Sequence, residues 1–265
     1  MDVTMVSGYF LALLVGVSLG LIGSGGSILT VPILVYILTV NPVLATAYSL
    51  FVVGSTALVG GLRNAFNKNV DFSIVWIFGI PSLIAAYLVR AFVIPAIPDV
   101  VFSAGTVSVT KSLLLMVLFA VVMLTASVRM IKSENSGTIT ANIDVSYSKL
   151  VVLGVLIGVL AGAVGAGGGF LIIPALVFLA HMPMKKAVGT SLFIIAIQSL
   201  AGFMGDVGQS NIDWPFLLVF TLMSVIGIFI GIALSNKIPG EKLKTSFGWF
   251  VLVMGIYILI KEIFM

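Results

Sequence analysis

The sequence has no cysteine, a single histidine (His181) and only 8% charged residues among its 265 positions. Without cysteine the chain can form no disulfide, no thiolate metal site and no thiol nucleophile. One histidine argues against a histidine-cluster metal site. Soluble domains carry about 25% charged residues, so this chain is too poor in charge to be a water-soluble enzyme or a nucleic-acid-binding module. We therefore expect no metal, no cofactor and no nucleic-acid partner.

Apolar residues dominate what is present, because 60% of the residues are hydrophobic and the mean hydropathy is +1.29. Residues 3–62 contain no charged residue, which is enough for about three crossings at about 20 residues each. A crossing must pair its own backbone N–H and C=O groups, and no alternating barrel pattern is present, so the crossings are predicted to be helices. The sequence thus predicts an all-α polytopic membrane protein, with about 8–10 transmembrane segments.

Glycine, proline and asparagine residues divide the apolar runs into ten segments. Two of these, residues 27–39 and 169–181, have about 13 residues each, or roughly 20 Å of helix against about 30 Å of hydrocarbon. Each follows a glycine cluster and contains a proline. We interpret both as halves of broken helices or as re-entrant hairpins. The other segments lie near residues 5–22, 43–62, 72–94, 107–131, 150–164, 186–204, 213–236 and 245–264.

The chain also contains an internal repeat. When the sequence is aligned with itself, Gly16–Asp71 matches Gly158–Asp213 without a gap, with 18 identities in 56 positions. We call this register the repeat alignment. It predicts two copies of one unit, residues 1–131 and 149–265, joined by a polar linker at residues 132–148. Each copy holds five segments, and because this number is odd, the second copy is predicted to lie inverted in the membrane relative to the first.

The charges predict the orientation of these repeats. Ten of the 13 lysine and arginine residues fall on one side of the predicted topology, while Arg90, Lys111 and Lys261 fall on the other. Loops rich in lysine and arginine stay in the cytoplasm. Both termini are therefore expected outside the cytoplasm, and the linker within it.

Inverted repeats with short, interrupted segments at matching positions are typical of secondary transporters, whose site lies near the bilayer midplane. The half-helices begin near Ser27 and Gly169, where free N–H groups favour an anion. Glycine lets the backbone approach a ligand closely. The candidate substrate-binding residues at the two breaks are Gly23, Ser24, Gly25, Gly26, Ser27, Gly165, Gly167, Gly168 and Gly169.

Other glycines are expected to serve packing only. Gly16 and Gly20, like Gly158 and Gly162 in the second copy, have the small-xxx-small spacing of close helix contacts. Asp71 and Asp213 align at helix starts, and we interpret them as N-terminal caps.

Polar residues within the apolar segments supply further candidates. Ser49 aligns with Ser191 and Thr56 with Gln198, and the spacing of seven positions places each pair on one helical face. Thr190 precedes Ser191 on the same segment. Single serine and threonine residues often bond their own helix, whereas a glutamine in hydrocarbon needs a partner. Arg90 is a candidate anion contact, with solvation at a segment end as the alternative.

The glycine clusters carry a resemblance to a known family. Two copies of Gly-x-Gly-Gly-[Gly/Ser]-x-x-x-x-Pro-x-Leu, at Gly23–Leu34 and Gly165–Leu176, resemble the sulfite exporter TauE/SafE family. This resemblance covers nearly the whole chain. It implies a multi-pass transporter of the prokaryotic inner membrane that exports sulfite, sulfonates or related small organic anions.

We therefore expect a secondary transporter of a small anion that works by alternating access, with the proton or the membrane potential as the driving force. No nucleotide-binding motif is present in the sequence. The alternative is a channel or cation-coupled carrier in which backbone carbonyls at the glycine breaks coordinate an ion. An intramembrane enzyme is disfavoured, because the sequence offers no paired acid and base. A homodimer is left open.

Overall fold

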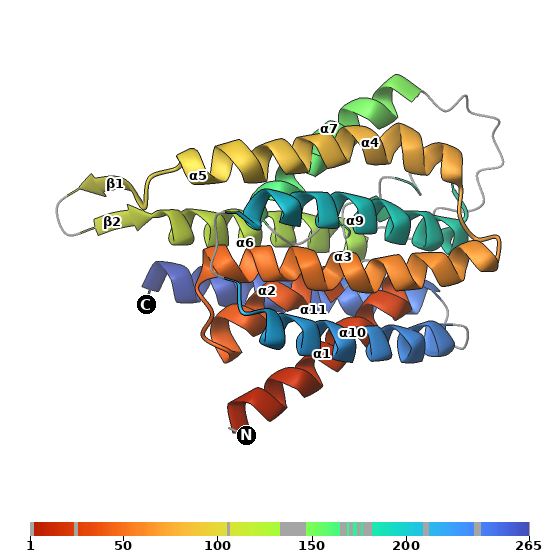
Figure 1. Ribbon diagram of the computed structural model, residues 1–265, viewed down its shortest axis with the longest axis horizontal. Helices are drawn as coiled ribbons and strands as arrows, with labels where there is room; N and C mark the ends of the chain where they lie inside the picture. Colours follow the sequence, from red (N-terminus) through yellow and green to blue (C-terminus); the bar gives the residue numbers. More distant parts are fainter. Residues whose placement is uncertain are drawn as a thin grey trace.

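The structure, a computed structural model, is a bundle of long helices (Figure 1). It describes residues 3–23, 26–104, 107–132, 147–164, 169, 172–173, 176, 182–208, 212–235 and 240–264. One end of the bundle carries a β-ribbon and the C-terminus, and the turn from α3 (Pro42–Phe66) to α4 (Phe72–Leu88) lies at the other end (Figure 1).

Helices make up nearly all of the described chain, as the sequence predicts. Four stretches are long and apolar enough to cross a membrane, namely Pro42–Phe66, Phe72–Ala96, Lys185–Asp206 and Trp214–Ser235. The described part of the chain is therefore a helical polytopic membrane protein. Its helices are α1 (Val3–Ile22), α2 (Gly26–Pro32), the π-helix η1 (Ile33–Ile37), α3 (Pro42–Phe66), α4 (Phe72–Leu88), the π-helix η2 (Val89–Val93), α5 (Ile94–Ala96), α6 (Lys111–Lys132), α7 (Tyr147–Val164), α9 (Met184–Asp206), α10 (Trp214–Ser235) and α11 (Gly240–Phe264).

A two-stranded antiparallel ribbon interrupts the helical pattern. Strand β1 (Val100–Ala104) pairs with β2 (Val107–Thr110), with Ala104 opposite Val107. The predicted helical segment 107–131 is therefore wrong for its first four residues. Two valines and a threonine among these four favour a strand, and the Thr110 side chain then accepts a hydrogen bond from the Leu113 N–H at 3.2 Å, which caps α6.

The chain breaks at the first glycine cluster, as the sequence predicts. Helix α1 ends at Ile22, Gly23 has a φ of +80°, and α2 starts at Gly26. A positive φ costs little for glycine and more for any residue with a Cβ. Pro32 lacks an N–H, and the π-helix η1 follows it. The segment from α2 through η1 is therefore too short to cross the bilayer. The second cluster lies almost entirely outside the described residues.

The helix contacts come in matching sets. Helix α1 packs on α10 and α4 packs on α7, while α3 packs on α9. The repeat alignment, continued past Asp71, relates α1 to α7, α3 to α9 and α4 to α10, so the first two contacts are equivalents of each other. Gly202 faces Leu50 and Gly61 faces Phe193, which means that α3 and α9 run antiparallel. An inverted second copy requires this antiparallel arrangement.

Glycines form the closest helix contacts, which confirms their predicted packing role. A Cβ at Gly16 would collide with the main-chain carbonyl of Ser224 on α10. A Cβ at Gly158 would collide with the carbonyl of Ser82 on α4. Ser82 and Ser224 are themselves equivalent in the continued repeat alignment. Both helix pairs therefore use the same backbone contact.

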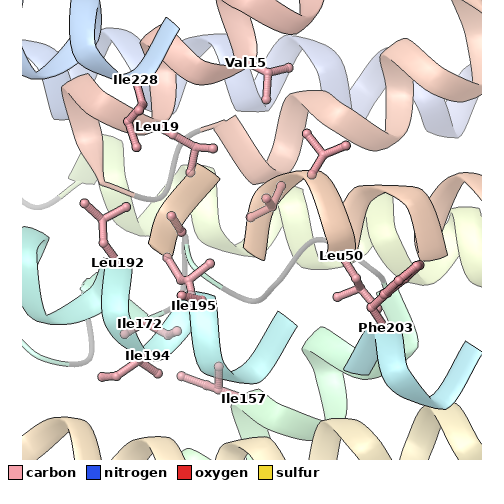
Figure 2. Close-up of a cluster of buried hydrophobic side chains, with 14 of the residues drawn as sticks. Val15, Leu19, Leu50, Ile157, Ile172, Leu192, Ile194, Ile195, Phe203 and Ile228 are labelled. Atoms are coloured by element: carbon pink, nitrogen blue, oxygen red, sulfur yellow. The ribbon is translucent and has the colours of Figure 1, made fainter. Parts of the chain in front are cut away.

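The main core fills the space between these helix pairs. Figure 2 shows Leu19 and Ile228 between α1 and α10, and Leu50 close to Phe203 between α3 and α9. A second apolar cluster joins α2, α6 and α11 and includes Met116. The helix pair α3 and α9 thus lies at the centre of the main core.

We predict that Gly158→Ala destabilises the protein and that Gly79→Ala does not. The Cβ at position 158 meets the Ser82 backbone, which cannot move away as a side chain can. Overpacking of this kind lowers the free energy of unfolding by about 1–3 kcal/mol. Gly79 lies on α4, the helix against which Gly158 packs, and there the nearest heavy atom lies 3.8 Å from the added Cβ. Thermal unfolding in detergent measures the difference, and equal effects at both positions would contradict this packing.

Candidate functional site

The polar residues proposed from the sequence lie at the centre of the bundle. Helices α3 and α9, which are packed against each other, carry all five of them. Each has an exposed fraction of 0%, so all five side chains are shielded from solvent. The residues are Ser49, Thr56, Thr190, Ser191 and Gln198.

Thr190 holds the start of a neighbouring helix. Its Oγ1 accepts a hydrogen bond from the Asp71 N–H at 3.0 Å, just before α4 begins. In the other half, the Tyr48 hydroxyl accepts from the Asp213 N–H at 2.7 Å, just before α10. The repeat alignment pairs Tyr48 with Thr190 and Asp71 with Asp213. The two helices are therefore anchored by equivalent bonds.

The two aspartates are helix caps, as the sequence predicts. Asp71 Oδ1 accepts from the Ser73 N–H at 3.1 Å, and Asp213 Oδ1 accepts from the Phe216 N–H at 3.1 Å. Such a carboxylate satisfies N–H groups that have no partner within the helix. Both residues have a structural role at the ends of membrane segments.

The amide of Gln198 has the partner that a buried amide needs. Its Oε1 accepts a hydrogen bond from Ser82 Oγ on α4. The sequence reasoning missed Ser82, although the continued repeat alignment pairs it with Ser224. Ser191 satisfies its own hydroxyl within α9, because its Oγ donates to the Val188 carbonyl at 2.9 Å. These two candidates therefore have hydrogen-bond partners within the bundle.

Other buried hydroxyls in this region lack partners. Ser49 Oγ and Thr56 Oγ1 make no hydrogen bond within the described chain, and the same holds for Ser199 and Ser224. A buried hydroxyl without a partner costs free energy. These four hydroxyls come from α3, α9 and α10, and they can donate to a ligand that accepts hydrogen bonds.

Only part of the glycine-rich candidate site lies within the described residues. Gly23 makes the break after α1, and a Cβ at Gly26 would collide with the Val15 carbonyl of α1. Gly169 is buried. The remaining candidates, and the side chain of Ser27, lie outside the described residues: Ser24, Gly25, Gly165, Gly167 and Gly168.

Arg90 differs most from expectation. Its side chain is 0% exposed, so the interpretation of Arg90 as a solvated residue at a segment end is wrong. Arg90 Nε lies 3.5 Å from Asp206 Oδ2, and none of the three guanidinium nitrogens makes a hydrogen bond to the residues that the structure describes. Arg90 belongs to the π-helix η2, and Asp206 is the last residue of α9. Local π-helical turns are frequent at functional sites.

Comparison with known proteins decides the family. The sulfite exporter TauE/SafE family model matches residues 9–258. The chain belongs to this family. The resemblance of the doubled glycine motif is thereby confirmed, and the chain is an integral membrane protein of a transporter family.

Relatives with similar lengths support the same class. A probable membrane transporter protein of Xylella fastidiosa (strain 9a5c) is 29% identical, over 93% of this chain and 91% of the relative. The probable membrane transporter protein YunE of Bacillus subtilis (strain 168) is 28% identical, over 96% of this chain and 97% of the relative. A probable membrane transporter protein of Methanocaldococcus jannaschii is 27% identical, over 94% and 95%. No solved structure matches the chain with comparable significance.

We predict that Thr190→Val lowers stability through the lost anchor of α4. The Asp71 N–H would lose its acceptor, which costs about 1–2 kcal/mol in the free energy of unfolding. Thr125→Val is the control, because Thr125 is exposed and, within the residues that the structure describes, its hydroxyl bonds to its own helix. Thermal unfolding in detergent checks both variants. An unchanged stability for Thr190→Val, together with weakened anion binding, would show that Thr190 contacts the substrate instead.

Proposed function

We propose that this chain is a secondary transporter that exports a small anion, such as sulfite, an organosulfonate or a related organic acid. The observation that carries the proposal is the set of buried hydroxyls without partners, with Ser49 and Thr56 at its centre. An oxyanion accepts several hydrogen bonds at once and would satisfy those of these donors that it reaches. Membership of a transporter family fits the same conclusion.

The transport cycle in this proposal is alternating access between two inverted repeats, residues 1–131 and 149–265. The matched helix contacts and the antiparallel α3 and α9 support it. Inverted repeats allow one arrangement to open on one side and its mirror arrangement on the other. In this proposed cycle, the arrangement in which the central residues are buried is an intermediate between the two.

The broken helices supply the backbone part of the proposed site. Gly23 bends the chain, and α2 starts at Gly26. The N–H groups in the first turn of a helix have no partner within that helix. Their partial positive charge favours an anion. We extend this role to Ser24, Gly25 and Ser27 and, by the repeat alignment, to Gly165 and to residues 167–169.

The proposal includes an orientation. Ten of the 13 lysine and arginine residues fall on one side of the predicted topology, which favours termini outside the cytoplasm in a prokaryotic plasma membrane. A proton is the proposed coupling ion.

The competing function is a channel or cation-coupled carrier that uses backbone carbonyls at the breaks. The unpartnered groups favour the anion, since the Arg90 guanidinium has donors only. Flux through proteoliposomes separates the two. We expect saturable flux of labelled sulfite, methanesulfonate or a small carboxylate, and no flux of sodium or potassium. Cation flux without anion flux would overturn the proposal.

We predict that Ser49→Ala and Thr56→Val each raise the KM for the anion about 5–10-fold, as the loss of one hydrogen bond of about 1–1.4 kcal/mol implies. Ser127→Ala is the matched control, because Ser127 is equally buried but bonds to the Leu124 carbonyl of its own helix. Its KM is expected to stay at the wild-type value. Equal values of KM for all variants would remove Ser49 and Thr56 from the site.

A further inference from the structure

Two polar contacts join α4 and its continuation η2 to α9 along one interface. Ser82 bonds Gln198, and Arg90 pairs with Asp206. The second contact lies eight positions after the first on both sides, from Ser82 to Arg90 and from Gln198 to Asp206. Eight positions correspond to about 12 Å at 1.5 Å per residue. Positions spaced by four and eight belong to one helical face. The ion pair therefore lies on the same face of α9 as Gln198, roughly two helical turns from it.

Glycines on α9 make room for the arginine side chain. A Cβ at Gly205 would lie 2.9 Å from Arg90 Cβ, and one at Gly202 would lie 3.9 Å from Arg90 Cγ. The methylene groups of Arg90 therefore pack against α9, and the side chain lies inside the bundle rather than reaching water. A guanidinium has five N–H donors, and here a single nitrogen approaches a carboxylate.

The equivalent positions in the other half of the molecule carry no charge. The continued repeat alignment places Ile232 at the position of Arg90 and Asn64 at that of Asp206. Asn64 bonds to the Gly60 carbonyl of its own helix at 3.0 Å, and α10 runs as an α-helix through Ile232. The repeated framework therefore does not require an ion pair at these positions. Buried ion pairs are also poor stabilisers compared with apolar residues.

The charged surroundings of the pair are simple. Lys111, at the start of α6, is the other cation that acts on the Asp206 carboxylate, and it is partly exposed, so water screens it. Among the elements packed on η2, the described part of α4 and α5 carries no charged residue. The remaining charges on α7 and α9 lie at the opposite ends of those helices, at Lys149, Lys185 and Lys186.

We propose that Arg90 and Asp206 couple the anion to a proton, so that one proton crosses with each monovalent anion. This inference rests on the proposed transport function. Guanidinium and carboxylate together are neutral, and an added anion would leave a net negative charge in a medium that penalises it. When Asp206 Oδ2 accepts a proton from water on the loading side, the carboxyl becomes neutral. The anion then replaces it as the partner of the Arg90 guanidinium.

The charge of the site stays constant through this exchange. On the far side the anion leaves, the O–H bond of Asp206 breaks, the proton passes to water and the ion pair forms again. No other bond changes. Transport is therefore electroneutral, and a pH gradient drives the anion toward the alkaline side. Export toward a more acidic side then requires an outward anion gradient that is larger than the opposing proton gradient.

Proteoliposomes with an alkaline lumen and an acidic exterior test the coupling. The probe is labelled methanesulfonate, which stays an anion at both pH values, with sulfite as a second probe. Wild-type protein is expected to accumulate the probe at least 5-fold above the outside concentration, with the membrane potential clamped at zero. Asp206→Asn should lose this accumulation, whereas exchange of labelled for unlabelled anion between equal pools at equal pH, which needs no net proton movement, should remain measurable. Asp99→Asn, at an exposed carboxylate, is the control and should keep both.

A second variant guards against a loss of fold. Asp206→Asn leaves Arg90 buried without a counter-charge, whereas the double variant R90Q/D206N removes both charges and is expected to unfold at the wild-type temperature. It should show no pH-driven accumulation and a KM raised at least 10-fold. Accumulation at the wild-type level by either variant would overturn the coupling role.

The outcomes also separate this inference from the function on which it rests. Wild-type protein that exchanges the anion but shows no accumulation under the pH gradient would overturn the coupling alone. Wild-type protein that neither exchanges nor accumulates sulfite, methanesulfonate or a small carboxylate would overturn the transport function as well.

Discussion

In a bilayer every polar group must find its hydrogen-bond partner inside the protein, and this constraint shapes the whole molecule. Long helices pair their own backbone groups. Close contacts at glycines, such as that of Gly16 on α1 with Ser224 on α10, bring the helices together. The helix starts at Asp71 and Asp213 are satisfied by side chains. Against this background, unpartnered groups such as Ser49 Oγ and the Arg90 guanidinium are exceptions that carry a cost. A ligand that accepts hydrogen bonds removes that cost.

The two halves share their framework and differ in their polar interior. The caps at α4 and α10 and the glycine contacts have equivalents in the opposite half. Helix α4 and its continuation η2 contact α9 through an amide and an ion pair, whereas the equivalent positions on α3 and α10 are the uncharged Thr56, Asn64, Ser224 and Ile232. The helix framework is thus present in both halves, whereas the buried ion pair and the amide contact occur at the α4–α9 positions and not at the equivalent positions.

The sequence predicts the framework well, because charge-free runs, glycine spacing and capping residues are local signals. It does not predict the cross-helix partners Ser82 with Gln198 and Arg90 with Asp206, since periodicity on one helix says nothing of the register between two. The sequence places Arg90 near a segment end, but distance from a loop along the chain does not measure depth in the bundle. The ribbon at Val100–Thr110 escapes prediction because a short β-branched run next to an apolar segment fits a strand or a helix.

An experimental structure in lipid nanodiscs with bound sulfite tests the central claim most directly. The claim predicts density for the oxyanion between α3 and α9, with an oxygen within about 3.2 Å of Ser49 Oγ or of Thr56 Oγ1. Density for the anion only at the surface of the bundle, or a continuous helix through Gly23 to Gly26, would contradict it.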